Sequence, residues 1–136
     1  MKYGSEFMRV FAVLICIPPG ASLLAQQAAQ PETVMVTLHV KPGAETDLQQ
    51  VIARHWTTAR QLQLVRDAPH LTARGTERGD KTYFVDVFTW RDSRLPDAAP
   101  TKIQKIWTDM NRLVEARDGH PAIEISVISV VSPGGF

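Results

Sequence analysis

A period of two residues marks two strands, at residues 33–41 and 81–90. In each segment, successive side chains point to opposite faces of a sheet. Residues 70–77 form a weaker strand candidate, and a Gly-containing turn joins them to residues 81–90, which predicts a hairpin. The β-branched run at residues 122–131 predicts the last strand.

A helical period governs the two segments between these strands. The first spans residues 45–66 and is stopped by Pro69. Its apolar stripe consists of Leu48, Val51, Ile52, His55, Ala59 and Leu62. The second begins at Pro100, which suits a first helical position, and runs toward Gly119, a natural helix stop. Its stripe consists of Ile103, Ile106, Trp107, Met110, Leu113 and Val114.

The order βαββαβ predicts one α+β domain with a ferredoxin-like fold over residues 33–131. In this fold a four-stranded antiparallel sheet, here with strand order 4-1-3-2, carries both helices on one face. We expect residues 26–32 to form a flexible leader and residues 132–136 a tail.

The second face of the sheet predicts a partner. We place the aliphatic rows under the helices: Val34, Val36, Leu38, Val40, Val85, Val87, Ile123, Ile125 and Val127. The uncovered face then carries Thr37, His39, Phe84, Asp86, Phe88, Trp90, Glu124, Ser126, Ile128 and Val130. An apolar area of this extent is not left in water. A second copy is the simplest cover, so we expect a homodimer whose sheets enclose a cavity, a dimeric α+β barrel.

The N-terminus has the pattern of a secretory signal peptide over residues 1–25. A basic start precedes a short apolar run at residues 10–17, and small residues follow before a polar stretch. The run is too short to span a bilayer, so no stable membrane anchor is expected after cleavage. We therefore expect an exported protein, periplasmic or extracellular. Residues 1–7, before Met8, fit either a native start or a vector-derived leader.

Charge and cysteine content exclude several classes of function. Residues 1–25 contain Lys2, Arg9 and Glu6, so removing them turns 15 basic and 14 acidic residues into 13 and 13. A chain without a basic surplus argues against a nucleic-acid partner. The only cysteine, Cys16, leaves with the signal, so no disulfide is expected. The histidines lack metal-ligand spacing and no glycine loop fits a phosphate, so we expect neither a metal nor a cofactor.

Three stretches carry a family resemblance: residues 41–45 (KPGAE), 83–92 (YFVDVFTWRD) and 121–125 (PAIEI). They resemble antibiotic-biosynthesis-monooxygenase-like proteins and the wider dimeric α+β barrel superfamily, over roughly residues 33–131. The sequence departs from these proteins at residues 98–101 (AAPT), where such proteins often carry a histidine. The resemblance therefore implies the fold and a ligand-sized cavity more than a particular chemistry.

His39 and Asp86 are the candidate catalytic pair. Their strands should be neighbours, and we expect both side chains to point into the cavity between the two sheets. An aspartate beside an imidazole fixes its tautomer and raises its basicity, which suits a general base. The alternative is a buried polar pair at the dimer interface whose members simply satisfy each other.

The candidate ligand-binding residues are Thr37, Phe84, Phe88, Trp90 and Arg74. The three aromatic rings suit a flat apolar ligand, or equally the core of a dimer interface. Arg74 reaches either an anionic ligand or only solvent. Two functions follow. The first is a cofactor-independent, monooxygenase-like enzyme acting on a small hydrophobic or aromatic compound. The second is a non-catalytic ligand-binding or assembly module of the cell envelope.

Overall fold

The computed structural model describes residues 29–132 of the 136. The predicted export signal at residues 1–25, the first part of the leader and residues 133–136 of the tail lie outside the described residues. The fold below belongs to the unit that begins at Pro31.

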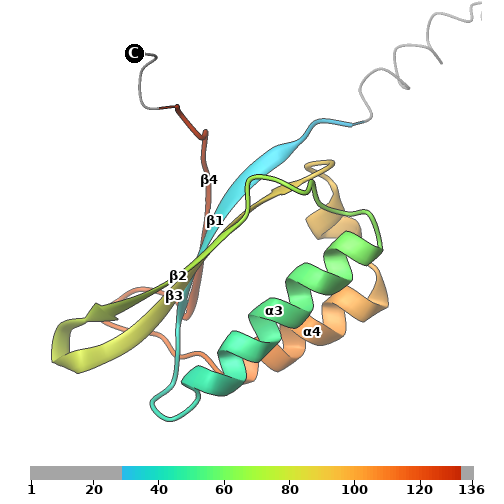
Figure 1. Ribbon diagram of the computed structural model, residues 1–136. Coiled ribbons are helices and arrows are strands. Elements are labelled where there is room, and N and C mark those ends of the chain that lie inside the picture. The colour runs from blue at the N-terminus through green and yellow to red at the C-terminus, as the bar shows by residue number, and fades with distance from the viewer. Residues whose placement is uncertain (1–28, 133–136) are drawn as a thin grey trace, which may run out of the picture. The chain divides into compact units, whose positions relative to one another are not determined.

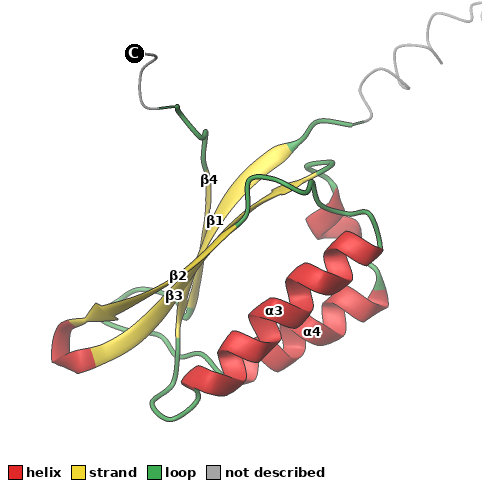
Figure 2. Cartoon of the chain, in the orientation of Figure 1, coloured by secondary structure: helices red, strands yellow, loops and turns green. Residues whose placement is uncertain are grey.

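Strands and helices of the described residues follow the predicted order (Figure 1). They are β1 (Glu32–His39), α3 (Glu45–Gln61), β2 (Leu71–Glu77), β3 (Lys81–Trp90), α4 (Thr101–Arg112) and β4 (Ile123–Val127). The strands form one antiparallel sheet in the order β2-β3-β1-β4, and both helices lie against the same side of it (Figure 2). The ferredoxin-like fold and its strand order are thus confirmed.

Helix α3 ends at Gln61, earlier than the predicted end at Arg66. The cause is a left-handed residue, Gln63, whose φ is 57°. A residue in this conformation just after a helix reverses the chain direction. Leu64 and Val65 consequently turn back into the core instead of continuing the helix, and both are buried.

Helix α4 also ends early, at Arg112 instead of near Gly119. Beyond it, Val114 pairs with Val40 as an isolated antiparallel bridge. The buried position of Val114 therefore reflects an extended segment beside the end of β1, which the helical spacing did not distinguish from another turn of helix. Strand β4 is likewise shorter than predicted and ends at Val127.

The register of β1 and β3 corrects the predicted faces of the sheet. Val34 lies opposite Phe88, Val36 opposite Asp86 and Leu38 opposite Phe84. Residues directly opposite each other in an antiparallel pair project from the same face. The row containing Phe84, Asp86, Phe88 and Trp90 therefore lies under the helices, and its predicted place on the uncovered face was wrong. Val85 and Val87, predicted under the helices, lie on the uncovered face instead.

Two apolar clusters fill the space between sheet and helices. One contains Val34, Ala59, Leu64, Val65, Phe88, Trp90, Ala99, Ile103 and Ile106, and the other Leu38, Val40, Leu48, Ile52, Phe84, Met110 and Val114. Both combine the aliphatic row of β1 with the aromatic row of β3. The large aromatic side chains were therefore needed to fill the volume beneath the helices, which aliphatic rows from both strands would fill less well.

The uncovered face still carries an apolar row that crosses three strands. Val87 lies opposite Met35 on one side and opposite Leu71 on the other, and Leu71 is 57% exposed. On the same face, the ring of Tyr83 lies against Gly75, where a Cβ atom would come within 2.2 Å of Cζ. Pairing of this face with a second copy stays a prediction.

Candidate functional site

A cavity of about 490 Å³ lies between the helix-covered face of the sheet and the helices. Its apolar wall includes Val34, Val36, Leu38, Ile52, Phe88, Trp90, Trp107, Met110 and Ile123. Ile125 and Val127 of β4 also line it, and each is 67% exposed, so the cavity opens to solvent at this edge strand. A mostly apolar concavity of this size with a few polar groups is typical of a small-molecule site.

Asp86 is one of two buried titratable groups on the cavity wall. The hydroxyl of Thr72, opposite it on β2, donates a hydrogen bond of 2.7 Å to Oδ1. Nε2 of His70 lies 3.2 Å from the same oxygen, and the His70 ring stacks on Trp56 with centroids 3.7 Å apart. Burial raises the pKa of Asp86, and the contacts with Thr72 and His70 offset part of that rise.

His55 is the second buried titratable group on the wall, and it comes from α3. The indole Nε1–H of Trp107 on α4 donates a hydrogen bond of 3.1 Å to its Nε2. The rings of Phe88 and Trp90 lie 5.5 and 6.1 Å from the imidazole, centroid to centroid. Burial, with a smaller effect from the charge of His70, lowers the pKa of His55 to about 4. His55 is therefore neutral at pH 7.

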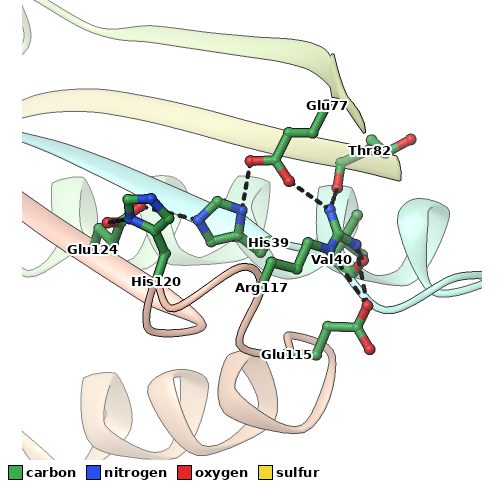
Figure 3. Close-up of polar contacts among 8 residues, drawn as sticks. All are labelled: His39, Val40, Glu77, Thr82, Glu115, Arg117, His120 and Glu124. Carbon is green, nitrogen blue, oxygen red and sulfur yellow. Dashed lines mark hydrogen bonds and ion pairs between the residues drawn. The ribbon is translucent and has the colours of Figure 1, made fainter. Parts of the chain in front are cut away.

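His39 is not part of this arrangement: it is the last residue of β1, and the register places it on the uncovered face. Figure 3 shows its polar contacts. His39 lies opposite Tyr83, and both side chains project from the uncovered face, whereas Asp86 projects from the helix-covered face. The expectation that His39 and Asp86 point into one cavity was therefore wrong. The reason is that the alternation in β3 defines two rows of side chains without saying which row faces the helices.

Both ring nitrogens of His39 face carboxylates. Nε2 lies 3.0 Å from Oε2 of Glu124, and Nδ1 lies 2.8 Å from Oε1 of Glu77, although the second contact is too bent for a hydrogen bond. The other oxygen of Glu124 lies 2.8 Å from Nδ1 of His120. The contacts from His39 and then His120 hold the pKa of Glu124 below its usual range. His39 therefore has one hydrogen-bonded nitrogen, Nε2, while its buried Nδ1 lies beside a carboxylate without a hydrogen bond.

Arg117 anchors the same network from the loop after α4 (Figure 3). Its guanidinium is buried and donates to the backbone oxygens of Val40 and Thr82. It also pairs with Glu77 at 3.0 Å and Glu115 at 3.3 Å. Burial alone would raise the pKa of Glu77, but the hydrogen bond from Arg117 and the contact with His39 lower it. The network joins the chain after α4 to the ends of all four strands of the sheet, which is a structural role.

The structure separates the remaining predicted ligand residues. Phe88 and Trp90 line the cavity, although it lies between sheet and helices instead of between two sheets. Phe84 belongs to the second core cluster, and the guanidinium carbon of Arg74 lies 6.0 Å from its ring centroid. Thr37 lies on the uncovered face, opposite Val85. Neither Phe84, Arg74 nor Thr37 lines the cavity.

The sequence interpretation missed His55 and Trp107 as site residues. His55 was placed on the apolar stripe of its helix, where a histidine usually serves packing. The one available signal was that Trp107 lies on the facing stripe of the other helix, with a donor that needs an acceptor when buried. Within residues 29–132, no three His, Cys, Asp or Glu side chains are arranged to hold a metal ion, and no helix is long and apolar enough to cross a membrane.

No protein-family model matches the sequence, and no curated protein matches it. Solved structures do match. A variant of SnoaB, a cofactor-independent oxygenase from Streptomyces nogalater, gives a TM-score of 0.55 at 17% identity, over 75% of this chain and 94% of that chain. An antibiotic biosynthesis monooxygenase gives 0.54 at 15% identity, over 76% and 100%. A conserved protein from Methanosarcina mazei Go1 gives 0.53 at 12% identity, over 72% and 90%. Identities this low show a common fold alone. The chain therefore has the fold of antibiotic-biosynthesis-monooxygenase structures, as its sequence motifs implied.

Proposed function

We propose that the protein binds a small hydrophobic or aromatic compound in the cavity between sheet and helices, and acts on it as a cofactor-independent, monooxygenase-like enzyme. The proposal rests on the composition of the cavity wall. It is mainly aliphatic and aromatic, and its two buried titratable groups are Asp86 and His55. In an apolar pocket, a small number of polar groups can orient a ligand and transfer protons to or from it.

The surroundings of Asp86 and His55 differ, and they suit the two residues to different roles. The carboxylate of Asp86 is held by Thr72 and His70, and no Arg or Lys lines the cavity to hold it ionised. Its raised pKa suits a group that accepts a proton from a bound compound. His55 is neutral and fixed by Trp107, which suits hydrogen bonding to the compound. The common fold with an oxygenase that needs no cofactor supports the same reaction class.

Binding is tested by tryptophan fluorescence, because Trp90 and Trp107 both line the cavity. Fluorene, a flat apolar compound, is expected to quench the emission saturably. Val36→Trp places a large side chain in the cavity and should abolish the quenching. Leu62→Trp, at the exposed end of α3, is the matched control that leaves binding intact. Absence of saturable quenching by any aromatic compound tried would contradict the proposal.

Turnover is tested by oxygen uptake with aromatic compounds that bind. Asp86→Asn should lower uptake by about a hundredfold or more, the usual contribution of a positioned acid or base. His39→Ala should leave the rate per folded molecule unchanged, because His39 lies outside the cavity. If no bound compound consumes oxygen, the alternative function remains, a non-catalytic ligand-binding module of the cell envelope.

We also propose a homodimer formed through the uncovered face. The cross-strand row of Leu71, Val87 and Met35 is the observation that supports it. Light scattering after size exclusion should give twice the chain mass, and Met35→Lys should give a monomer. Leu62→Lys, directly after α3 and away from this face, is the control and should stay dimeric. A monomeric wild type would exclude the barrel. Export remains a prediction, tested by recovering the protein outside the cytoplasm with Gln26 as its first residue.

A further inference from the structure

We propose that His39, protonated on both ring nitrogens, is a pH-sensitive latch that fastens the edge strand β4 to the rest of the sheet. The imidazolium lies between two carboxylates that come from the two edge strands, Glu77 at the end of β2 and Glu124 in β4 (Figure 3). The inference does not rest on the proposed function, because it concerns the attachment of a strand and no ligand enters its test.

The contacts of the His39 ring assign its charge. Oε1 of Glu77 lies 2.8 Å from Nδ1, and Oε2 of Glu124 lies 3.0 Å from Nε2. A neutral imidazole carries one proton, so either tautomer directs a lone pair at one of these carboxylate oxygens. That contact is repulsive, and the His39 side chain is only 5% exposed, so little water screens it. The imidazolium directs an N–H toward each carboxylate, and two opposite charges at these distances offset the cost of burying its own.

The groups around the latch keep both carboxylates ionised. The other titratable or charged side chains near His39 and its two partners are Lys81 and Tyr83 of β3 and, from the chain after α4, Glu115, Arg117 and His120. Burial of Glu77 acts against ionisation, but the hydrogen bonds from Arg117 and His39 lower its pKa. The contacts with His39 and then His120 lower the pKa of Glu124. Both carboxylates are therefore negative wherever His39 changes its charge.

Loss of the His39 charge affects the two edge strands differently. Glu77 still pairs with Arg117 at 3.0 Å, and an arginine does not titrate in the pH range of a histidine. Glu124 retains only His120, whose side chain is 62% exposed and which is itself a histidine. The release therefore falls on Glu124 and on β4.

Strand β4 is poorly held without this contact. It stands at the edge of the sheet and pairs with β1 over the five residues Ile123–Val127. Edge segments of this kind open at a lower free energy than the core of a domain. Ile125 and Val127 line the open side of the cavity, so a rise in pH that loosens β4 also loosens that side.

Hydrogen exchange of the backbone amides in the full chain measures the latch. The reporters are the amides of β4 and of Ile128, which donates to the carbonyl oxygen of Thr33 at 3.0 Å. We expect their protection factors, corrected for the intrinsic pH dependence of exchange, to fall by about tenfold between about pH 6 and about pH 9, as for one lost hydrogen bond to a charged group. The amides of α4 are the internal reference and should keep their protection.

Two variants separate His39 from other causes. His39→Gln cannot carry the charge, so the protection of its β4 amides should be low at both pH values. His120→Gln is the matched control, because it removes the other histidine on Glu124 and should retain the pH dependence. Light scattering should give one mass at both pH values, and dissociation over the same interval would assign the loss of protection to an interface and overturn the latch.

A spectrum of the wild type tests the charge itself, even if His39→Gln does not fold. At about pH 6 the ¹⁵N chemical shifts should show both ring nitrogens of His39 protonated. A neutral His39 in this spectrum overturns the inference. So does protection of β4 that stays constant with pH in the wild type, or a pH dependence that persists in His39→Gln.

Discussion

Burial of a neutral histidine makes the stability of this protein sensitive to mild acid. The pKa of His55 is about 4 in the folded chain, against an ordinary value of 6.5. The unfolded chain therefore binds the proton more readily. The contribution of His55 is fully present above pH 6.5 and is lost as the pH falls toward 4. Each pKa unit is worth about 1.4 kcal/mol, so about 2 kcal/mol of unfolding free energy is lost between pH 7 and pH 5.

Urea unfolding at several pH values measures this loss, and His55→Gln isolates it. The variant retains Asp86 and His70, the titratable neighbours of His55, so their effects cancel in the difference between the two proteins. The wild type should lose about 2 kcal/mol more than the variant between pH 7 and pH 5. Parallel curves for the two proteins would refute the reasoning, since they would mean that His55 titrates alike in the folded and unfolded chain.

Three further outcomes are expected. Gly75→Ala should lower the free energy of unfolding by about 1 kcal/mol, because the Tyr83 ring must leave its place, and the loss should vanish in a Tyr83→Ala background. Arg117→Met should cost about 3 kcal/mol by urea unfolding, since it leaves Glu77 and two buried carbonyls without their donor, and a cost below about 1 kcal/mol would contradict this role. The pKa of Glu124 is lowered in the folded chain, so its stabilisation is present above its ordinary pKa and lost as the pH falls through the folded value. Glu124→Gln should accordingly flatten the fall in thermal stability below pH 4.5, and an unchanged profile would exclude the ion pair.

The order of elements and the strand pairing were predictable because they depend on local periodicity. Residues 81–90 were predicted as a strand and form one with the same bounds. The faces were not predictable in the same way, because the strand is apolar on both sides. The charged Asp86 made the aromatic row resemble the polar face of the strand. In the structure its carboxylate is buried, and the contacts with Thr72 and His70 satisfy it. A charged residue in an otherwise apolar row therefore did not mark the exposed face.

The contacts within the His39 network and between His55 and Trp107 could not be predicted from local sequence patterns either. His39 meets Glu124 across 85 positions of sequence, and Trp107 meets His55 across 52. Such pairs depend on the register of the strands and on the rotation of two helices, neither of which the spacing of residues determines. The residue types gave candidates for titratable groups, and only their three-dimensional placement separated a structural network from a cavity wall.

Strand β4 has a consequence for how a ligand enters and leaves. It pairs with β1 alone over five residues, and its inward side chains Ile125 and Val127 are largely exposed. Weakly held edge segments open at a lower free energy than the core of a domain. The part of the cavity wall that opens most readily is thus also the route by which a ligand enters and leaves. Tighter attachment of β4 would lengthen the residence time of a ligand without adding a single contact to it.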